Sequence, residues 1–279
     1  MTKKFTVKKS SGESQDFSEE KLYHSLRNAG ASDEVTGVII GEIRKELYEG
    51  IPTRAIYRKA FQLLRRRVHT TAGRYSLKNA IMELGPTGYP FETYIGELFR
   101  RLGYDTKTGQ IVQGHCVKHE VDVVAWNKHE KLMIECKYHN IPGKVNSVQI
   151  PLYIQSRFLD IRAVWEKLPE NSKKQLSGWV ITNTRFSDDA TAFGTCAGLR
   201  LVGWDFPHHG SLKMLIENTR LFPVTAVSGL NKKQKQTLID QHIVLCSDLA
   251  ADTKILETLK LPPRLMKNVV AEIHELSGN

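Results

Sequence analysis

The pattern of apolar and polar positions divides the chain into three regions, of which the first covers residues 1 to about 85. Residues 5–7 (Phe-Thr-Val) are strand-like, and residues 10–12 (Ser-Ser-Gly) are typical of a turn. Ser18 followed by Glu19 and Glu20 predicts the start of a helix, because a serine hydroxyl caps free amides and acids favour the positive helix end. Further helices are predicted over about 33–48, 53–68 and 71–84.

The second region, about 89 to 210, alternates helices with strands, and the third, 220 to 279, is helical. Residues 85–88 (Gly-Pro-Thr-Gly) are typical of a linker ahead of the second region. The elements predicted there are a helix at 91–102 ended by Gly103, strands at 108–113, 119–126 and 131–138, a helix at 146–167, a strand at 178–183, a helix at 187–197 and a strand at 199–204. Such alternation favours a mixed α/β fold with a central mixed sheet flanked by helices.

Length and composition are those of a soluble chain with two or three domains, since its 279 residues are 41% hydrophobic. No apolar run approaches about 18 residues, so no membrane span is expected. The basic N-terminal stretch lacks the hydrophobic segment of a signal peptide, so we expect a cytoplasmic location. Four scattered cysteines are expected to be reduced thiols. The net charge of +10 favours a polyanionic partner such as DNA.

Candidate chemistry is concentrated on two neighbouring predicted strands. Because side chains alternate along a strand, Glu135 and Lys137 share one face and Cys136 lies on the other. Asp122 stands between valines, in a buried pattern where an acid needs a partner or a metal. Two carboxylates can hold Mg²⁺ or Mn²⁺, which polarises a phosphodiester, while the lysine orients water. Asp122, Glu135 and Lys137 therefore form a candidate catalytic set for cutting DNA.

The order of these residues resembles that of the PD-(D/E)xK nucleases, and most of all the Mrr-type restriction endonucleases. Asp122 matches the motif aspartate, and Glu135 and Lys137 match the E-x-K element. Glu92 matches the helix glutamate of the family, and Gln149 begins a Q-x-x-x-Y element. The resemblance implies a restriction-endonuclease-like core over residues 86–215, with Glu92, Asp122 and Glu135 handling the metal and Gln149 assisting catalysis.

The resemblance continues downstream and has two departures. Residues 178–183 and 201–205 resemble the later core strands of the Mrr type. Val121 stands in place of the proline that gives the family its name. Pro151 interrupts the Q-x-x-x-Y element and is expected in the first turn of its helix, where proline is tolerated.

Two other interpretations of the same residues are open. The E-x-K pair alone is also typical of a solvated ion pair on an edge strand, and Asp122 would then be an acid at a strand end. Cys116 and His119, together with Cys136 and His139, imitate a zinc site with two cysteines and two histidines. Strand alternation argues against zinc, because it directs Cys136 away from the E-x-K face.

The first region resembles the ATP-cone, the regulatory ATP/dATP-binding domain of ribonucleotide reductases. The resemblance rests on residues 7–12, 17–22 and 48–57, and it implies a nucleotide site lined by Val7, Lys9, Lys21 and Thr53. Ser10 stands where the family usually carries an arginine. The alternative is a helical DNA-binding or dimerisation domain with a basic surface.

The last region faintly resembles a helix-hairpin-helix unit, which would grip the DNA backbone through main-chain amides and lysines. A helical bundle that docks on the nuclease core is an equal alternative. The sequence thus predicts three parts: an ATP-cone (1–85), a catalytic core (86–215) and a helical tail (216–279). Together they predict a Mg²⁺-dependent DNA endonuclease regulated by ATP or dATP, and cutting of two strands favours a homodimer. The alternatives are a non-catalytic, nucleotide-responsive DNA binder, or a repair or Holliday-junction nuclease.

Overall fold

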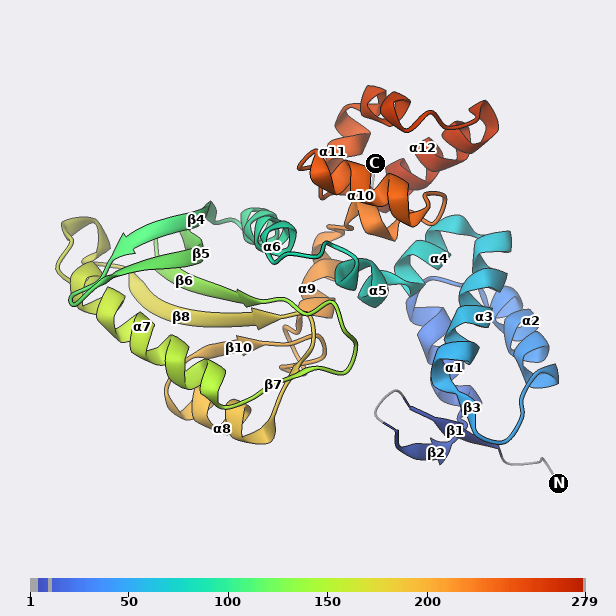
Figure 1. Cartoon of the computed structure of the whole chain (residues 1–279), viewed down its shortest axis with the longest axis horizontal. Coiled ribbons are helices and arrows are strands. Elements are labelled where there is room, and N and C mark those ends of the chain that lie inside the picture. Colours follow the sequence, from blue (N-terminus) through green and yellow to red (C-terminus); the bar gives the residue numbers. More distant parts are fainter. Residues whose placement is uncertain (1–4, 10–11, 278–279) are drawn as a thin grey trace. The chain divides into compact units, whose positions relative to one another are not determined.

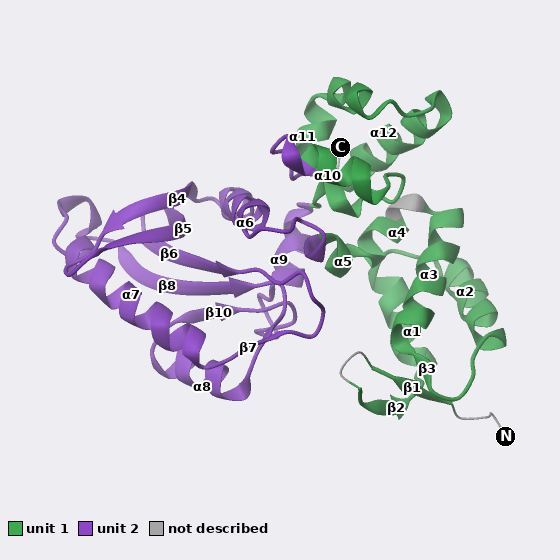
Figure 2. Cartoon of the chain, in the orientation of Figure 1, with its two compact units in different colours: residues 1–80, 222–238, 246–279 green, residues 81–221, 239–245 purple. Residues whose placement is uncertain are grey.

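The computed structural model describes residues 5–9 and 12–277, with the side chains of residues 69 and 70 excluded. The chain forms two compact units (Figure 2). Unit 1 contains residues 1–80, 222–238 and 246–279, and unit 2 contains residues 81–221 and 239–245. Most of the predicted helical tail therefore groups with the N-terminal region instead of forming a third part. No helix in the described part of the chain has the length and apolar character needed to cross a membrane.

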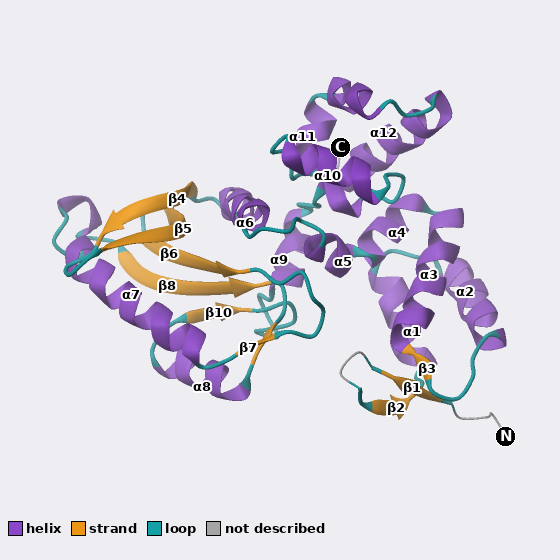
Figure 3. Cartoon of the chain, in the orientation of Figure 1, coloured by secondary structure: helices purple, strands orange, loops and turns teal. Residues whose placement is uncertain are grey.

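Unit 2 is built around a five-stranded sheet with the order β10-β8-β6-β5-β4 (Figures 1 and 3). Its strands are β4 (Asp105–Gln113), β5 (Lys118–Trp126), β6 (Glu130–Lys137), β8 (Gln175–Thr182) and β10 (Arg200–Val202). The β4–β5 and β5–β6 pairs are antiparallel, whereas β6–β8 and β8–β10 are parallel. The predicted central mixed sheet is confirmed.

Helices cover both faces of this sheet. They are α6 (Tyr89–Arg101), α7 (Gln149–Trp165), α8 (Asp188–Cys196) and α9 (Leu212–Thr219). Phe158 of α7 belongs to the same buried cluster as Met133 and Val180, so α7 packs on their face. Trp179 precedes Val180 and therefore points to the other face, where its ring lies 5.4 Å from that of Phe99 on α6. Burying each such side chain stabilises the fold by about 1.5–3 kcal/mol.

Two short strands, β7 (Val145–Asn146) and β9 (Arg185–Phe186), form a parallel pair. In the sequence, β7 follows β6 and β9 follows β8. The sequence pattern did not predict this pair, because each strand has only two residues. The amide of Asn146 connects it by hydrogen bonds to Thr182 and Thr184, at 3.1 and 3.3 Å.

Unit 1 begins with a three-stranded sheet of order β2-β1-β3, formed by β1 (Thr6–Lys8), β2 (Ser14–Asp16) and β3 (Ile51–Pro52). It continues with α1 (Glu19–Asn28), α2 (Asp33–Lys45), α3 (Thr53–Arg67), α4 (His69–Tyr75) and α5 (Leu77–Met82). Ser18 caps α1 as predicted, since its hydroxyl accepts a hydrogen bond of 3.1 Å from the amide of Lys21. The helix predicted at 71–84 is instead divided between α4 and α5. At that point the Ser76 hydroxyl donates to the Gly73 carbonyl, an alternative to regular helix bonding.

The C-terminal helices of unit 1 are α10 (Lys232–Asp240), α11 (Cys246–Ala251) and α12 (Pro263–Ser277), with 3-10 turns η2 (Val224–Ala226) and η3 (Thr253–Leu259). A third turn, η1 (Pro169–Asn171), belongs to unit 2. Contacts join the tail to the N-terminal helices. The Thr225 hydroxyl donates to the Ala80 carbonyl at 2.7 Å, and a Cβ added at Gly73 would lie 2.9 Å from the Ala226 carbonyl oxygen. These contacts place most of the tail in unit 1, whereas residues 239–245 belong to unit 2. The alternative of a helical bundle that docks on the nuclease core stays a prediction.

The turn that resembles a helix-hairpin-helix element uses its main-chain amides internally. The carboxylate of Glu272, which is 3% exposed, accepts hydrogen bonds from the amides of Ser228 and Gly229 at 2.6 and 3.0 Å. A carboxylate of this chain thus occupies the position that a DNA phosphate would need at these two amides.

Candidate active site

The candidate site lies where the pairing of β5 with β6 ends. Their hydrogen-bonded register runs from Trp126 opposite Lys131 to Val123 opposite Ile134. One further step would place Asp122 opposite Glu135, but the ladder stops. Instead, Oδ2 of Asp122 accepts a hydrogen bond of 2.7 Å from the amide of Cys136. The side chain of Asp122 thus replaces a backbone partner and is held beside the E-x-K element.

The neighbouring strand β4 is also interrupted at this level. The β4–β5 pairing omits Gly109, which the register places opposite Asp122. Gly109 has a φ of +60°, a left-handed conformation that favours glycine, and a Cβ there would meet no atom within 4 Å. Backbone conformation, and not space, therefore explains the glycine at this interruption.

Glu135 is an almost fully buried acid with two cations around it. Its side chain is 1% exposed, Oε2 lies 3.3 Å from Nζ of Lys137, and Oε1 lies 2.7 Å from Nη1 of Arg157. The short contact to Arg157 lacks hydrogen-bond geometry, so Oε1 is a buried acceptor toward which no N–H of the described residues points. Burial and repulsion by Asp122 raise the pKa of Glu135 to about 7.

Two further acids, Glu92 and Asp122, interact electrostatically with Glu135. Burial, followed by repulsion from Asp122, Glu120 and Glu135, raises the pKa of Glu92 to about 7. Burial also raises the pKa of Asp122, against the opposing effects of the Cys136 amide and of Lys137. Glu92 thus belongs to the same electrostatic group as the two strand acids, although it comes from α6. The sequence analysis did not single out Glu120, which precedes the motif aspartate by two positions.

Lys137 is positioned by a buried polar network at the end of β8. Its carbonyl accepts a hydrogen bond of 2.7 Å from the hydroxyl of Thr182. Thr182 is fully buried and also contacts Asn146, whose Oδ1 lies 3.0 Å from Nε2 of His139. Asn183 exchanges two hydrogen bonds with the backbone of His139, at 2.9 and 2.7 Å. These bonds fix the chain that follows the E-x-K element, while the side chain of Lys137 stays 28% exposed.

Helix α7 contributes a residue that the motif search missed. Arg157 is 12% exposed, and besides contacting Glu135 it donates to the carbonyl of Glu120. Gln149, Tyr153 and Arg157 are spaced by four residues and so lie along one side of α7. The guanidinium lies 5.5 Å from the ring centre of Tyr153. This i, i+4, i+8 spacing was the signal in the sequence that points to Arg157.

Gln149 itself is exposed at the start of α7, and Pro151 is the third residue of that helix, as predicted for its first turn. Within the described residues, Gln149 makes no hydrogen bond to Asp122, Glu135 or Lys137. Its assisting role in catalysis stays a prediction.

The residues of the alternative zinc site take other partners. Asp160 of α7 lies 2.7 Å from Nε2 of His119 and accepts a 2.7 Å hydrogen bond from the amide of Cys116. Hydrogen bonds from His119 and from the Cys116 amide lower the pKa of Asp160 well below its usual range. Cys136 is buried at 7% exposure, and His139 contacts Asn146. These contacts organise the hairpin between β4 and β5 around an aspartate.

The acids of the site fit a divalent cation. A buried carboxylate oxygen without a directed donor, and acids whose mutual repulsion raises their pKa values, both call for positive charge. Asp122 and Glu135 would hold the ion, and Mg²⁺ commonly takes only one or two carboxylates and keeps its waters. No three acidic, histidine or cysteine side chains in the described part of the chain are close enough together to hold an ion. A direct role of Glu92 as a third ligand stays a prediction.

The residues predicted to line a nucleotide site lie in unit 1. Val7 is 2% exposed and belongs to the core, and Lys21 is exposed on α1. Lys9 is exposed and forms an ion pair of 3.3 Å with Glu13. Thr53 is the first residue of α3, whose start has no side-chain cap. Ser10 and Ser11 of the predicted turn lie outside the described residues.

Comparisons with known proteins identify the class to which the sheet domain belongs. Residues 85–205 match a family model described as restriction endonuclease, so this part of the chain is a restriction-endonuclease domain and the predicted Mrr-type resemblance is confirmed there. Residues 222–277 match a model described as AF1548-like, C-terminal. Neither match extends to residues before 85, so the resemblance to an ATP-cone stays a prediction.

The particular family follows from two relatives. An uncharacterized protein of Archaeoglobus fulgidus is 34% identical over 185 residues, which are 66% of this chain and 100% of the relative. A crystal structure of a protein of unknown function, AF1548, is 32% identical and aligns with a TM-score of 0.53 over 69% of this chain and 100% of that chain. The chain belongs to the AF1548-like family.

Proposed function

We propose that this protein is a metal-dependent DNA endonuclease whose reaction takes place at Asp122, Glu135 and Lys137. The observation that carries the proposal is the meeting of two acids and a lysine where the β5–β6 ladder ends, inside a restriction-endonuclease domain. The bound Mg²⁺ or Mn²⁺ would polarise the phosphodiester and lower the pKa of a water. Lys137 holds positive charge beside the attacked phosphate, and Arg157 holds Glu135 in place.

Cleavage of a supercoiled plasmid in the presence of Mg²⁺ tests this proposal. We expect wild-type protein to nick or linearise the plasmid, and Lys137→Ala to lose about 10²-fold or more of the rate, because one stabilising charge at the phosphate is gone. Lys118→Ala is the matched control, since Lys118 is an exposed lysine of the adjacent strand, and it should cleave like the wild type. If the wild-type protein retards DNA in gel-shift experiments but does not cleave it, the non-catalytic DNA binder is favoured instead. Plasmid, cruciform and damaged DNA compared side by side separate a restriction-type substrate from a repair or junction substrate.

We further propose that ATP or dATP binds unit 1 and regulates cleavage. Parallel pairing of Val7 with Ile51 and of Lys8 with Pro52 brings the end of β1, and with it Lys9, next to the start of α3. Free amides and the positive end of a helix attract phosphate, and Lys9 adds a charge. These features support a triphosphate site at Lys9 and Thr53, with Lys21 and the backbone of Val7 contributing.

Calorimetric titration with ATP and dATP tests the nucleotide site. Lys9→Ala should weaken binding about tenfold, whereas Lys45→Ala, which removes an exposed lysine in a similar ion pair, should not. Nucleotide should also change the cleavage rate of the wild type and not that of Lys9→Ala. If Lys9→Ala and Lys45→Ala bind ATP and dATP equally well, the nucleotide site proposed in residues 1–80 is refuted. Sedimentation with and without DNA tests whether a homodimer assembles to cut both strands.

A further inference from the structure

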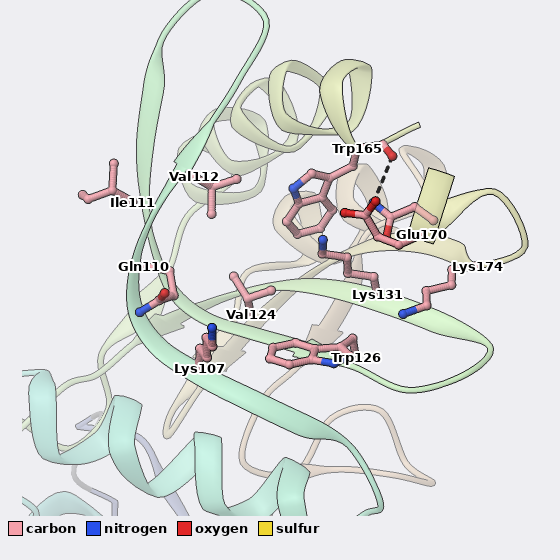
Figure 4. A pocket seen from close by; sticks show the side chains of 11 residues that line it. Lys107, Gln110, Ile111, Val112, Val124, Trp126, Lys131, Trp165, Glu170 and Lys174 are labelled. Atoms are coloured by element: carbon pink, nitrogen blue, oxygen red, sulfur yellow. Dashed lines mark hydrogen bonds between the residues drawn. The ribbon is translucent and has the colours of Figure 1, made fainter. Parts of the chain in front are cut away.

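A cavity of about 340 Å³ opens on the face of the sheet that α7 covers, and none of the acids of the nuclease site lines it (Figure 4). It is lined by residues of β4, β5 and β6, by the end of α7 and by the turn η1 that follows it. Val124 and Trp126, which line it, follow Asp122 by two and four residues along β5, or roughly 7 and 13 Å. Small-molecule pockets typically enclose about 300–1,000 Å³, so the volume suits a compact ligand.

Two indole rings and a lysine form the wall of this cavity. Trp126 and Lys131 are cross-strand partners on β5 and β6 and therefore project on the same side. The ammonium of Lys131 lies 4.5 Å from the ring centre of Trp165, a cation–π contact from the end of α7. In the view of Figure 4, Lys131 lies between the two indoles. Trp165 is 3% exposed and fixed in the core, whereas Trp126 is half-buried and presents ring surface to the cavity.

The cavity carries an excess of positive charge. Lys107, Lys131 and Lys174 line it together with a single acid, Glu170. Burial lowers the pKa of Lys131; the negative charge of Glu170 opposes this effect, and the positive charge of Lys174 adds to it. A bound anion would reduce the repulsion between these ammonium groups. An anionic ligand is therefore favoured over a neutral apolar one.

The wall of the cavity contains a buried amide side chain, that of Asn171. Asn171, 4% exposed, uses its amide nitrogen to donate to the Trp165 carbonyl at 2.9 Å. Its Oδ1 accepts no hydrogen bond from the residues that the structure describes. Such an oxygen costs free energy unless a donor reaches it, and the exocyclic amino group of a nucleobase is a donor of suitable kind.

We propose that this cavity is a nucleotide-binding site, in which a base stacks against Trp126 and the phosphate contacts the lysines. Inorganic phosphate would leave the indole surface unused, and an apolar ligand would leave the lysines unpaired. A nucleotide satisfies both, because every base has a face that stacks on an aromatic ring and the phosphate is anionic. The nucleotide is either a free mononucleotide or a residue of a DNA strand, because both present the same base and phosphate.

Calorimetric titration of the full chain with dAMP, without divalent metal, tests the site independently of DNA cleavage. We expect saturable binding, weakened about tenfold or more by Trp126→Ala and by Lys174→Glu. Lys173→Glu is the matched control, because Lys173 is exposed, adjacent in sequence and absent from the cavity wall, and it should bind dAMP like the wild type. Lys174→Glu changes only a partly exposed side chain, so it keeps the test valid if Trp126→Ala unfolds.

Further ligands distinguish a nucleotide site from simpler ones. Adenosine and ribose 5-phosphate should each bind about tenfold or more weakly than dAMP, because each lacks one half of the recognised chemistry. The proposal is overturned if dAMP shows no saturable binding at millimolar concentration, or if ribose 5-phosphate binds as tightly as dAMP. It is also overturned if Lys174→Glu leaves dAMP binding unchanged while Lys9→Ala abolishes it. The last outcome would assign the nucleotide to unit 1.

Oligonucleotides that contain 2-aminopurine identify the source of the base. A rise of its fluorescence in duplex DNA that Trp126→Ala abolishes would show that the cavity accepts a base of the DNA. Binding of dAMP with no such change in single-stranded or duplex DNA would show that the site takes free nucleotides. Either result supports the site.

Discussion

Replacing Arg157 with methionine removes the cation nearest to Glu135 while keeping much of the apolar stem. The guanidinium lies 2.7 Å from Oε1 of Glu135, and the two side chains are 12% and 1% exposed. Because burial and Asp122 raise the pKa of Glu135 from 4.5 to about 7, its ionisation already costs the folded state about 3 kcal/mol above that pH. Loss of Arg157 leaves the ionised acid with less compensation. Removing one partner of a fully buried ion pair costs about 3–5 kcal/mol, and the loss here is expected to be smaller because Arg157 is 12% exposed.

The sign of the pH dependence follows from linkage. A carboxyl with a raised pKa binds more protons in the folded than in the unfolded state, so stability falls as pH rises from the unfolded value of 4.5 through about 7. Arg157 holds the pKa values of Glu135 and Asp122 down, so its removal extends this fall to higher pH. We therefore expect Arg157→Met to lose about 2 kcal/mol near pH 8 and less near pH 5, where Glu135 is protonated in both proteins.

Thermal unfolding followed by circular dichroism at several pH values measures this loss. About 2 kcal/mol corresponds to a fall in Tm of roughly 4–8 °C for a chain of this size. Arg162→Met is the matched control, because Arg162 is also on α7 but forms an exposed ion pair with Glu166, worth less than about 1 kcal/mol. A penalty for Arg157→Met that does not change with pH, or that equals the control, would refute the electrostatic account of Glu135.

Two other predictions test the charge of the site and the packing of the core. Plasmid cleavage at constant Mg²⁺ should increase from about pH 6 to about pH 8. Glu92 and Glu135 have pKa values of about 7 and must ionise to favour a cation. A cleavage rate that is flat over this range would contradict the assignment. Gly194→Ala should lower the free energy of unfolding in denaturant by about 1–3 kcal/mol, because the added Cβ would lie 2.5 Å from Leu201. Gly41 lies on α2, and a Cβ there meets no atom within 4 Å, so Gly41→Ala should raise the free energy of unfolding by about 0.5–1 kcal/mol.

Strand alternation was sufficient to predict how the E-x-K element is presented. In the structure the ammonium of Lys137 lies 3.3 Å from Glu135, and Cys136 is buried on the other face of β6. Each of these residues has its direction fixed by its own strand, and local sequence carries that information. The catalytic roles of Asp122, Glu135, Lys137 and Gln149 remain predictions.

Contacts between distant segments could not be predicted in the same way. The hydrogen bond from the Cys136 amide to Asp122 depends on where the β5–β6 ladder stops, and the contact of Arg157 with Glu135 depends on how α7 crosses the sheet. No local pattern encodes either position. The association of the C-terminal helices with the N-terminal region depends on long-range contacts such as that of Thr225 with Ala80, 145 residues apart in sequence.

One face of the sheet carries both proposed sites, and α7 spans them. Arg157 and Trp165 are eight residues apart on this helix, or roughly 12 Å, which matches the spacing of Asp122 and Trp126 along β5. Substitutions that far apart without shared partners usually have additive effects. Because Glu135 contacts Arg157 and Lys137, whereas the cavity is lined by Lys107 and Lys131, the two groups of cations have no acid in common. Stacking in the cavity and charge compensation at Glu135 are therefore physically separate, and the failure of one proposal leaves the other standing.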